Sequence, residues 1–284
     1  MYRSPFNSRL LASAAVLASL TLAGCQTTAR TGDVTGSVSA QPAPRGEADW
    51  RREADAWGER YRRNEKDPEA AVRYAQALRA TGQRAQAVAV LEQASINNPR
   101  NNTVLGAYGR ALADTGNFAQ ALDVLGRSHT PDQPDWRILN VQGAVLDQMG
   151  RHDEARRHYQ SALKIVPGEP SVMSNLGLSY ALSKNLPQAE ATLRQANAAG
   201  NREPRVRQNL ALVVGLQGRF KEAEEIARAD LTQEEAAANL DYLRQMLAAD
   251  QNGKTPKRTA RAERNARSTA HAMSASGRMD YERD

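Results

Sequence analysis

Cysteine and aromatic residues are scarce in this chain of 284 residues. Its single cysteine, Cys25, excludes an internal disulfide, so disulfide usage does not indicate the compartment. Aromatic residues make up 5% of the sequence, and valine, isoleucine and phenylalanine are few beside alanine, leucine, arginine, glutamate and glutamine. Straight-chain side chains lose little rotamer freedom in a helix, so this balance favours helices over strands. We therefore expect an all-α fold.

Motifs that accompany catalysis or metal binding are also missing. The sequence contains no HExxH, GxSxG or GxxxxGK[ST] stretch, and no second cysteine that could join Cys25 as a metal ligand. His152 and His158 are six residues apart, which places them on different faces of a helix rather than in an i, i+4 metal pair. Glu224 and Glu225 are adjacent and would point apart. We predict a non-enzymatic protein with no catalytic residue, metal, cofactor or small-molecule substrate.

The formal net charge of +6 arises at the two ends of the chain. Arg3 and Arg9 precede every acidic residue, and residues 251–284 carry eight basic and four acidic side chains. From residue 10 to residue 250 the two signs balance. A nucleic-acid-binding domain usually concentrates basic charge on its folded face. We therefore expect no nucleic-acid partner.

The N-terminus has the pattern of an export signal. MYRSPFNSR precedes LLASAAVLASLTLAG, an apolar run that is too short to span a bilayer comfortably but typical of a signal peptide. The run ends in LAG, and with Cys25 this LAGC stretch, residues 22–25, resembles a bacterial lipobox, which implies cleavage before Cys25 and lipid attachment to its thiol. The alternative is an ordinary secretory signal with an incidental cysteine. Gln26 is not the aspartate that retains lipoproteins in the inner membrane, so the resemblance implies a lipid anchor in the outer membrane, facing the periplasm.

Composition then separates the flanking segments from the folded part. We predict a signal peptide at residues 1–24 and a lipidated cysteine with a flexible linker at residues 25–47. Residues 250–284 have no apolar period, and we expect a disordered basic tail. Such a tail is either solvated or a contact for anionic lipid headgroups, peptidoglycan or an acidic partner. The segments between are a capping helix at 48–67, repeats at 68–235 and a second capping helix at 236–249.

A period of 34 residues runs through the repeats. Glycine recurs at this spacing, with Asn185 one residue out of register at the missing step, and an alanine follows each glycine five residues later. These features resemble the tetratricopeptide repeat (TPR), in which two antiparallel helices meet at a turn where glycine tolerates a left-handed backbone. The resemblance implies an all-α TPR superhelical solenoid of about five helix-turn-helix repeats with terminal capping helices. The turn glycines are Gly82, Gly116, Gly150 and Gly218, and the units lie at about 68–101, 102–135, 136–169, 170–203 and 204–235.

The ends of the array carry capping signals, which a solenoid needs to cover its terminal faces. Trp50, Ala54, Trp57 and Tyr61 share one helical face, either as cap packing or as a surface for partner docking. Thr232 and Glu235 predict a capping box, and an apolar stripe follows it. Small residues within first helices, where a neighbouring helix could approach closely, are Gly109, Gly143 and Gly177.

The stretch from Val206 to Leu247, VRQNLALVVGLQGRFKEAEEIARADLTQEEAAANLDYLRQML, is more distinctive than a generic repeat. It resembles the C-terminal signature of the TadD-type lipoproteins of tight-adherence (Flp) pilus assembly, and the match extends over about residues 50–248. The resemblance implies a periplasmic scaffold whose partners are pilus assembly proteins, the outer-membrane secretin among them. Asn185 in place of the turn glycine and the long basic tail depart from the pattern. The alternative is a TPR adaptor lipoprotein for another envelope complex, such as cell-wall synthesis or outer-membrane protein assembly.

The concave face of such a solenoid, lined by first helices, is the predicted partner-binding surface. Asparagine side chains there could pair with the backbone of an extended ligand, and arginine side chains with its carboxylates. Alternatively, Asn175 and Asn209 stabilise loops between repeats. The candidate residues are Arg137, Asn140, Asn175, Arg205, Gln208 and Asn209.

Overall fold

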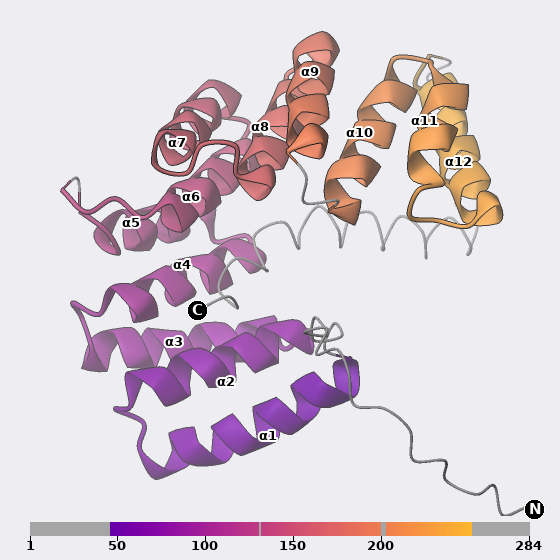
Figure 1. The fold of residues 1–284 in the computed structure, drawn as a ribbon. Helices are drawn as coiled ribbons and strands as arrows, with labels where there is room; N and C mark the ends of the chain where they lie inside the picture. Colours follow the sequence, from indigo (N-terminus) through magenta and orange to yellow (C-terminus); the bar gives the residue numbers. More distant parts are fainter. Residues whose placement is uncertain (1–45, 131, 200–202, 252–284) are drawn as a thin grey trace, which may run out of the picture. The chain divides into compact units, whose positions relative to one another are not determined.

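The computed structural model describes residues 46–130, 132–199 and 203–251 (Figure 1). The predicted signal peptide, Cys25 and most of the linker and basic tail lie outside these residues. The regular structure within the described ranges is helical, and no strand is formed there. The helices are α1 (Glu47–Arg63), α2 (Pro68–Ala80), α3 (Arg84–Asn97), α4 (Asn102–Asp114), α5 (Phe118–Arg127), α6 (Trp136–Gln148), α7 (His152–Ile165), α8 (Pro170–Leu182), α9 (Leu186–Ala198), α10 (Pro204–Leu216), α11 (Phe220–Ala227) and α12 (Gln233–Gln251).

The helices from α2 to α11 pair into five consecutive helix-turn-helix units. The two helices of each unit pack on each other, and each second helix packs on the first helix of the next unit. Each first helix also contacts the first helix that follows it, so α2, α4, α6, α8 and α10 form a row. At the ends, α1 packs on α2, while α12 packs on α10 and α11. This packing confirms the predicted TPR fold with terminal capping helices.

Capping residues at the 34-residue period explain where the first helices begin. Asp67 precedes α2, and its carboxylate accepts hydrogen bonds from the backbone N–H groups of Glu69 and Ala70. Asn101, Asp135 and Glu169 accept equivalent bonds at the starts of α4, α6 and α8. Such caps satisfy N–H groups that have no partner inside the helix. At the C-terminal end, Thr232 and Glu235 form the predicted capping box in front of α12.

The core repeats a single packing arrangement, in which a large second-helix residue lies over a first-helix glycine. A Cβ atom added to Gly109 would lie 2.4 Å from Leu125, and one added to Gly177 would lie 2.7 Å from Leu193. In the third unit the large residue is Tyr159, against Gly143. The small first-helix residue therefore lets the two helices approach, as the sequence predicts. The recurring alanines Ala87, Ala121, Ala155, Ala189 and Ala223 are fully buried.

The turn of the fourth unit differs from the sequence-based assignment. The turn glycines of the other units have φ values between +75° and +82°. The residue with positive φ in the fourth unit is Lys184, at +64°, and not Asn185. Asn185 instead caps α9, where its side chain accepts a hydrogen bond from the backbone N–H of Gln188. Equal helix lengths keep the turn in exact 34-residue register, although asparagine tolerates the left-handed conformation better than lysine.

Replacing Lys184 by glycine should stabilise the protein by about 1 kcal/mol, because glycine adopts positive φ without the steric cost of a Cβ atom. Urea unfolding followed by circular dichroism measures the change. Gln160→Gly, at an exposed position within α7, is the matched control and should destabilise by about 1 kcal/mol. A Lys184→Gly variant no more stable than the wild type would contradict the prediction.

Candidate protein-binding face

The six predicted partner-binding residues lie on three neighbouring first helices. Arg137 and Asn140 belong to α6, and Asn175 belongs to α8. Arg205, Gln208 and Asn209 belong to α10. We call α2, α4, α6, α8 and α10 together the first-helix row. Because consecutive first helices contact each other, the row brings these side chains to neighbouring positions in units three to five.

The three asparagines of this set point into the structure and join one unit to the next. Asn140, Asn175 and Asn209 are all buried. Asn175 Nδ2 donates a 2.9 Å hydrogen bond to Asn140 Oδ1, and Asn209 Nδ2 donates a 2.9 Å bond to Ser174 Oγ. Each bond spans 35 residues and links two helices rather than two loops. These contacts hold adjacent first helices together, while partner binding by the asparagines remains a prediction.

The other three residues are half-buried at the surface of the row. The Arg137 guanidinium lies over the ring of Trp136, with its central carbon 4.8 Å from the ring centroid. This stacking orients the guanidinium at the start of α6. Arg205 and Gln208 lie in the first two turns of α10. Arginine can bind a carboxylate through two parallel hydrogen bonds, so Arg137 and Arg205 suit acidic groups on a partner.

A buried carboxylate joins the third and fourth units at the end of α6. Asp147 accepts a 3.0 Å hydrogen bond from the Tyr159 hydroxyl and a 2.8 Å bond from the Ser179 hydroxyl. Nδ1 of His152 lies 2.8 Å from the same carboxylate. Burial raises the pKa of the Tyr159 hydroxyl well above its ordinary value, and the neighbouring Asp147 adds to this shift. No sequence pattern indicated this cluster, since its members come from three helices.

An ion-pair network joins the fourth and fifth units. Glu190 of α9 accepts hydrogen bonds from Arg194, Gln217 and Arg219. Glu222 of α11 accepts a 2.6 Å bond from Arg194 and pairs with Arg219. Burial alone would raise the pKa of Glu190, but the hydrogen bonds from Gln217, Arg194 and Arg219 lower it to about 2. Glu190 therefore stays ionised at neutral pH and holds the last two units together.

Glu190→Gln should make the free energy of unfolding less dependent on pH below the ordinary carboxyl pKa of 4.5. Because the folded-state pKa is lower, the unfolded chain binds more protons, so acid destabilises the wild type between about pH 4.5 and pH 2. Urea unfolding at neutral pH and at about pH 3 measures the slope. Glu225→Gln, at an exposed position of α11, is the control and should follow the wild type. Equal slopes for wild type and Glu190→Gln would contradict the prediction.

Part of the first-helix row is apolar, which the sequence analysis did not predict. Leu182, the last residue of α8, is 48% exposed. Leu212 and Leu216 occupy the corresponding part of α10 and are half-buried. The 34-residue register between Leu182 and Leu216 could have indicated this feature. The row therefore combines basic groups at the starts of α6 and α10 with apolar groups at the ends of α8 and α10.

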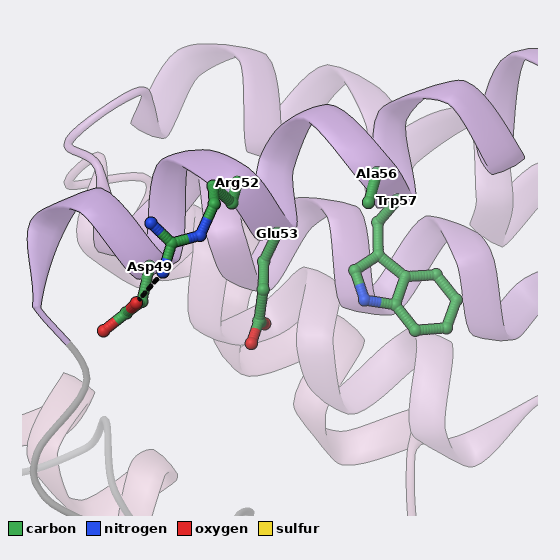
Figure 2. Close-up of a pocket in the computed structure, with 5 residues that line it drawn as sticks. All are labelled: Asp49, Arg52, Glu53, Ala56 and Trp57. Carbon is green, nitrogen blue, oxygen red and sulfur yellow. Dashed lines mark hydrogen bonds and ion pairs between the residues drawn. The ribbon is translucent and has the colours of Figure 1, made fainter.

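The N-terminal capping helix carries a shallow pocket on one face (Figure 2). Its lining residues all come from α1: Asp49, Arg52, Glu53, Ala56 and Trp57. Asp49 and Arg52 form an ion pair at one end, and the Trp57 ring lies at the other. Trp57 also packs against the apolar core of the first units, with the Arg60 guanidinium 5.0 Å from its ring centroid. Cap packing is thus observed for Trp57, while partner docking there remains a prediction.

The described residues form neither a candidate metal cluster nor a candidate membrane span. Histidine, cysteine, aspartate and glutamate form no group of three or more within them that could hold a metal ion. Their helices include none that combines the length and apolar character needed to cross a membrane.

Comparisons with known proteins agree with the fold. A tetratricopeptide-repeat family model matches residues 148–213. The family model described as anaphase-promoting complex, cyclosome, subunit 3 matches residues 52–128. No curated protein matches the chain. Together with the helix packing, these matches identify the chain as a TPR-repeat protein, and such repeats generally serve protein–protein interaction.

Solved structures of TPR proteins share this architecture at low sequence identity. PilW, described as a widely conserved type IV pilus biogenesis factor, is 16% identical with a TM-score of 0.57, over 67% of this chain and 91% of PilW. Pseudomonas aeruginosa PilF is 18% identical with a TM-score of 0.52, over 72% of this chain and 88% of PilF. A thermophilic TPR protein of Thermus thermophilus is 20% identical with a TM-score of 0.52, over 59% of this chain and 91% of that protein. At these identities the likeness concerns the fold.

Proposed function

We propose that this protein is an outer-membrane-anchored periplasmic TPR scaffold of the tight-adherence (Flp) pilus. It binds other proteins during assembly of the pilus secretion machinery and aids assembly of the secretin. The observation that carries this proposal is the stretch from Val206 to Leu247, which resembles the signature of TadD-type lipoproteins. The lipobox-like LAGC at residues 22–25 supports it independently.

The structure supports treating this stretch as a folded unit. It covers most of α10, all of α11 and most of α12. Its apolar residues Leu210, Val214, Leu240 and Leu243 share one buried cluster. The fold likeness to PilW, a type IV pilus biogenesis factor, is consistent with a role in pilus assembly. A scaffold needs no catalytic group, which agrees with the prediction of a non-enzymatic protein.

Deletion of the gene tests the proposal. The deletion strain should lose surface pili and the secretin multimer, and the wild-type gene should restore both. Electron microscopy of the cells and immunoblotting of unheated membranes measure these outcomes. Normal piliation in the deletion strain would overturn the proposal. Co-purification of a cell-wall or outer-membrane assembly complex in place of pilus proteins would support the alternative adaptor role.

Charge reversal on the first-helix row tests which surface binds. A protein with both Arg137→Glu and Arg205→Glu should fold but fail to restore pili, since the surface would then repel acidic groups on its partner. Arg157→Glu, with a side chain 67% exposed on second helix α7, is the matched control and should restore piliation. Full piliation in cells that express the double variant would show that these two arginines are not part of the binding surface.

Substitutions at the cleavage site test the proposed anchor. Cys25→Ala should leave an uncleaved precursor that incorporates no labelled palmitate, because the thiol that receives lipid is missing. Gln26→Asp should remain lipidated but fractionate with the inner membrane. Membrane fractionation and palmitate labelling measure both outcomes. Labelled fatty acid in the Cys25→Ala protein would contradict the lipobox assignment.

A further inference from the structure

Helix α1 follows the 34-residue register of the second helices. Trp57 lies three 34-residue periods before Tyr159, so it occupies the same second-helix position. Tyr159 packs over Gly143 of its own first helix. The residues at the first-helix position in front of α1 are 34–46, which belong mostly to the predicted linker and include two prolines. Because proline interrupts a helix interior, this sequence does not favour a first helix for α1 to pack on.

Two faces of α1 are covered to different extents. One face packs on α2: Ala54, Gly58 and Tyr61 are buried there. The other face, which we call the open face, has four residues that are half-buried or exposed, although their equivalents one period later in α3 are all buried. The equivalent pairs are Glu53 and Ala87, Ala56 and Val90, Trp57 and Leu91, and Arg60 and Ala94. The open face therefore corresponds to the face that a second helix turns toward its own first helix.

The shallow pocket of α1 lies on the open face. Glu53, Ala56 and Trp57 belong to both. The side chains of Glu53 and Trp57 project on the same side of α1 (Figure 2). In the first unit, α2 packs on α3 and covers the equivalent side chains. The pocket is thus part of the surface against which a first helix would pack.

Arg73 of α2 occupies a position that joins consecutive first helices elsewhere in the chain. Asn175 and Asn209 lie at the same register position, and both donate a hydrogen bond to the preceding first helix. Among the described residues no first helix precedes α2, and Arg73 is exposed and makes no hydrogen bond or ion pair with them. A helix that packs on the open face as a first helix would therefore meet a guanidinium donor here.

The later units show which residues such a helix needs. The acceptor of each of these hydrogen bonds lies three residues before the glycine that the large second-helix residue covers. The acceptor and glycine pairs are Asn140 with Gly143, and Ser174 with Gly177. A bound helix with the same spacing would bring its acceptor to Arg73 and its small residue to Trp57, since three residues span a fixed rise and rotation in an α-helix.

We propose that the open face and Arg73 bind an amphipathic α-helix of another protein, which packs there as a first helix packs on its second helix. The bound helix has glycine or alanine over Trp57 and, three residues earlier, an aspartate or glutamate that pairs with Arg73. A basic side chain of the same helix meets the Glu53 carboxylate, because Glu53 stands where α3 has a fully buried alanine. This surface lies on other helices than Arg137 and Arg205, and the inference does not depend on the pilus function.

The C-terminal end of a second copy does not provide a helix of this kind. Helix α12 follows α11 at the position of a further first helix. Its residue at the glycine position is Gln245, which is exposed and larger than the site over Trp57 admits. Asp241 stands at the position of the buried Leu139. Head-to-tail stacking of copies would therefore lack the small and apolar residues that first helices use, so we assign the open face to a different protein.

Binding of a first-helix peptide to the full chain tests the proposal. The probe is a fluorescein-labelled peptide with the sequence of residues 135–149, which contains α6 and its cap Asp135. This peptide has an acceptor, Asn140, three residues before Gly143. Fluorescence anisotropy measures its affinity. We expect saturable binding.

Matched variants locate the bound peptide. Ala56→Arg, at an exposed position in the pocket, should weaken binding about tenfold, whereas Ala119→Arg, at an exposed position of α5, should leave it unchanged. Arg73→Glu should weaken binding because it removes the donor. A peptide with Gly143→Leu should bind about tenfold more weakly, because leucine would collide with Trp57.

Absence of saturable binding at millimolar peptide would overturn the proposal, and so would equal affinities of the wild type and Ala56→Arg. A dimer of the wild type in analytical ultracentrifugation that is missing in Ala56→Arg would assign the open face to a second copy and overturn the proposal as well. A photocrosslinker at position 56 that joins residues 252–284 of the same chain would assign the face to the tail, with the same consequence.

Discussion

Asp147→Ala should lower the free energy of unfolding by about 3 kcal/mol, because it leaves buried hydroxyl groups without an acceptor. The Tyr159 and Ser179 hydroxyls both donate to this carboxylate, and both residues are almost completely inaccessible to solvent. His152 would lose its Nδ1 partner as well. Since these side chains come from α6, α7 and α8, the loss would weaken the junction between the third and fourth units. Urea unfolding monitored by circular dichroism measures the effect.

Asp153→Ala is the matched control for this experiment. Its carboxylate pairs with Arg156 but is 83% exposed, so its removal should change stability by less than about 1 kcal/mol. A double-mutant cycle between Asp147→Ala and Ser179→Ala should show coupling, since the two residues share a hydrogen bond. An Asp147→Ala protein within about 1 kcal/mol of the wild type would show that water replaces the lost carboxylate.

Gly143→Ala should destabilise the protein by about 2 kcal/mol through overpacking. An added Cβ atom would lie 2.5 Å from Cε1 of Tyr159, a separation too short for two carbon atoms. Tyr159 is 1% exposed and hydrogen-bonded to Asp147, so its ring cannot move aside without breaking that bond. Either α6 and α7 separate or the Tyr159 hydroxyl loses its acceptor. Thermal and urea unfolding should both record the loss.

Gly126→Ala is the control for the glycine substitution. A Cβ atom at Gly126, in the last turn of α5, would meet no atom within 4 Å. Alanine favours helix over glycine, so this change should be neutral or stabilising by up to about 1 kcal/mol. A Gly143→Ala protein as stable as Gly126→Ala would show that the two helices absorb a methyl group without loss.

Local sequence patterns were sufficient to predict the repeats. The turn glycines, the alanines that follow them and the capping box at Thr232 are each recognised from residues close together in the chain, within one unit. Such features appear in sequence because helix caps, turns and helical faces follow short-range rules. The turn of the fourth unit is the exception. Asparagine's preference for positive φ favoured Asn185, but the helix lengths place Lys184 at the turn.

The binding face was less predictable from sequence. The positions of Arg137, Asn140 and Asn175 on first helices followed from the period, but the directions of their side chains did not. A helix rotated slightly about its axis would expose Asn140, and the packing of α6 against α8 instead buries it against Asn175. Leu182 is exposed for the corresponding reason, since nothing among the described residues covers the end of α8 there.

The chain's sequence thus established the TPR repeats and their all-helical character. It also contains the lipobox-like stretch that ends at Cys25. This motif is read from consecutive residues and needs no tertiary contact. The Asp147 cluster and the Glu190 network emerged only in three dimensions. Each joins side chains from different helices, and the distances between them depend on how those helices pack. Short-range sequence rules specify where a helix begins and ends, whereas helix packing specifies which polar groups meet.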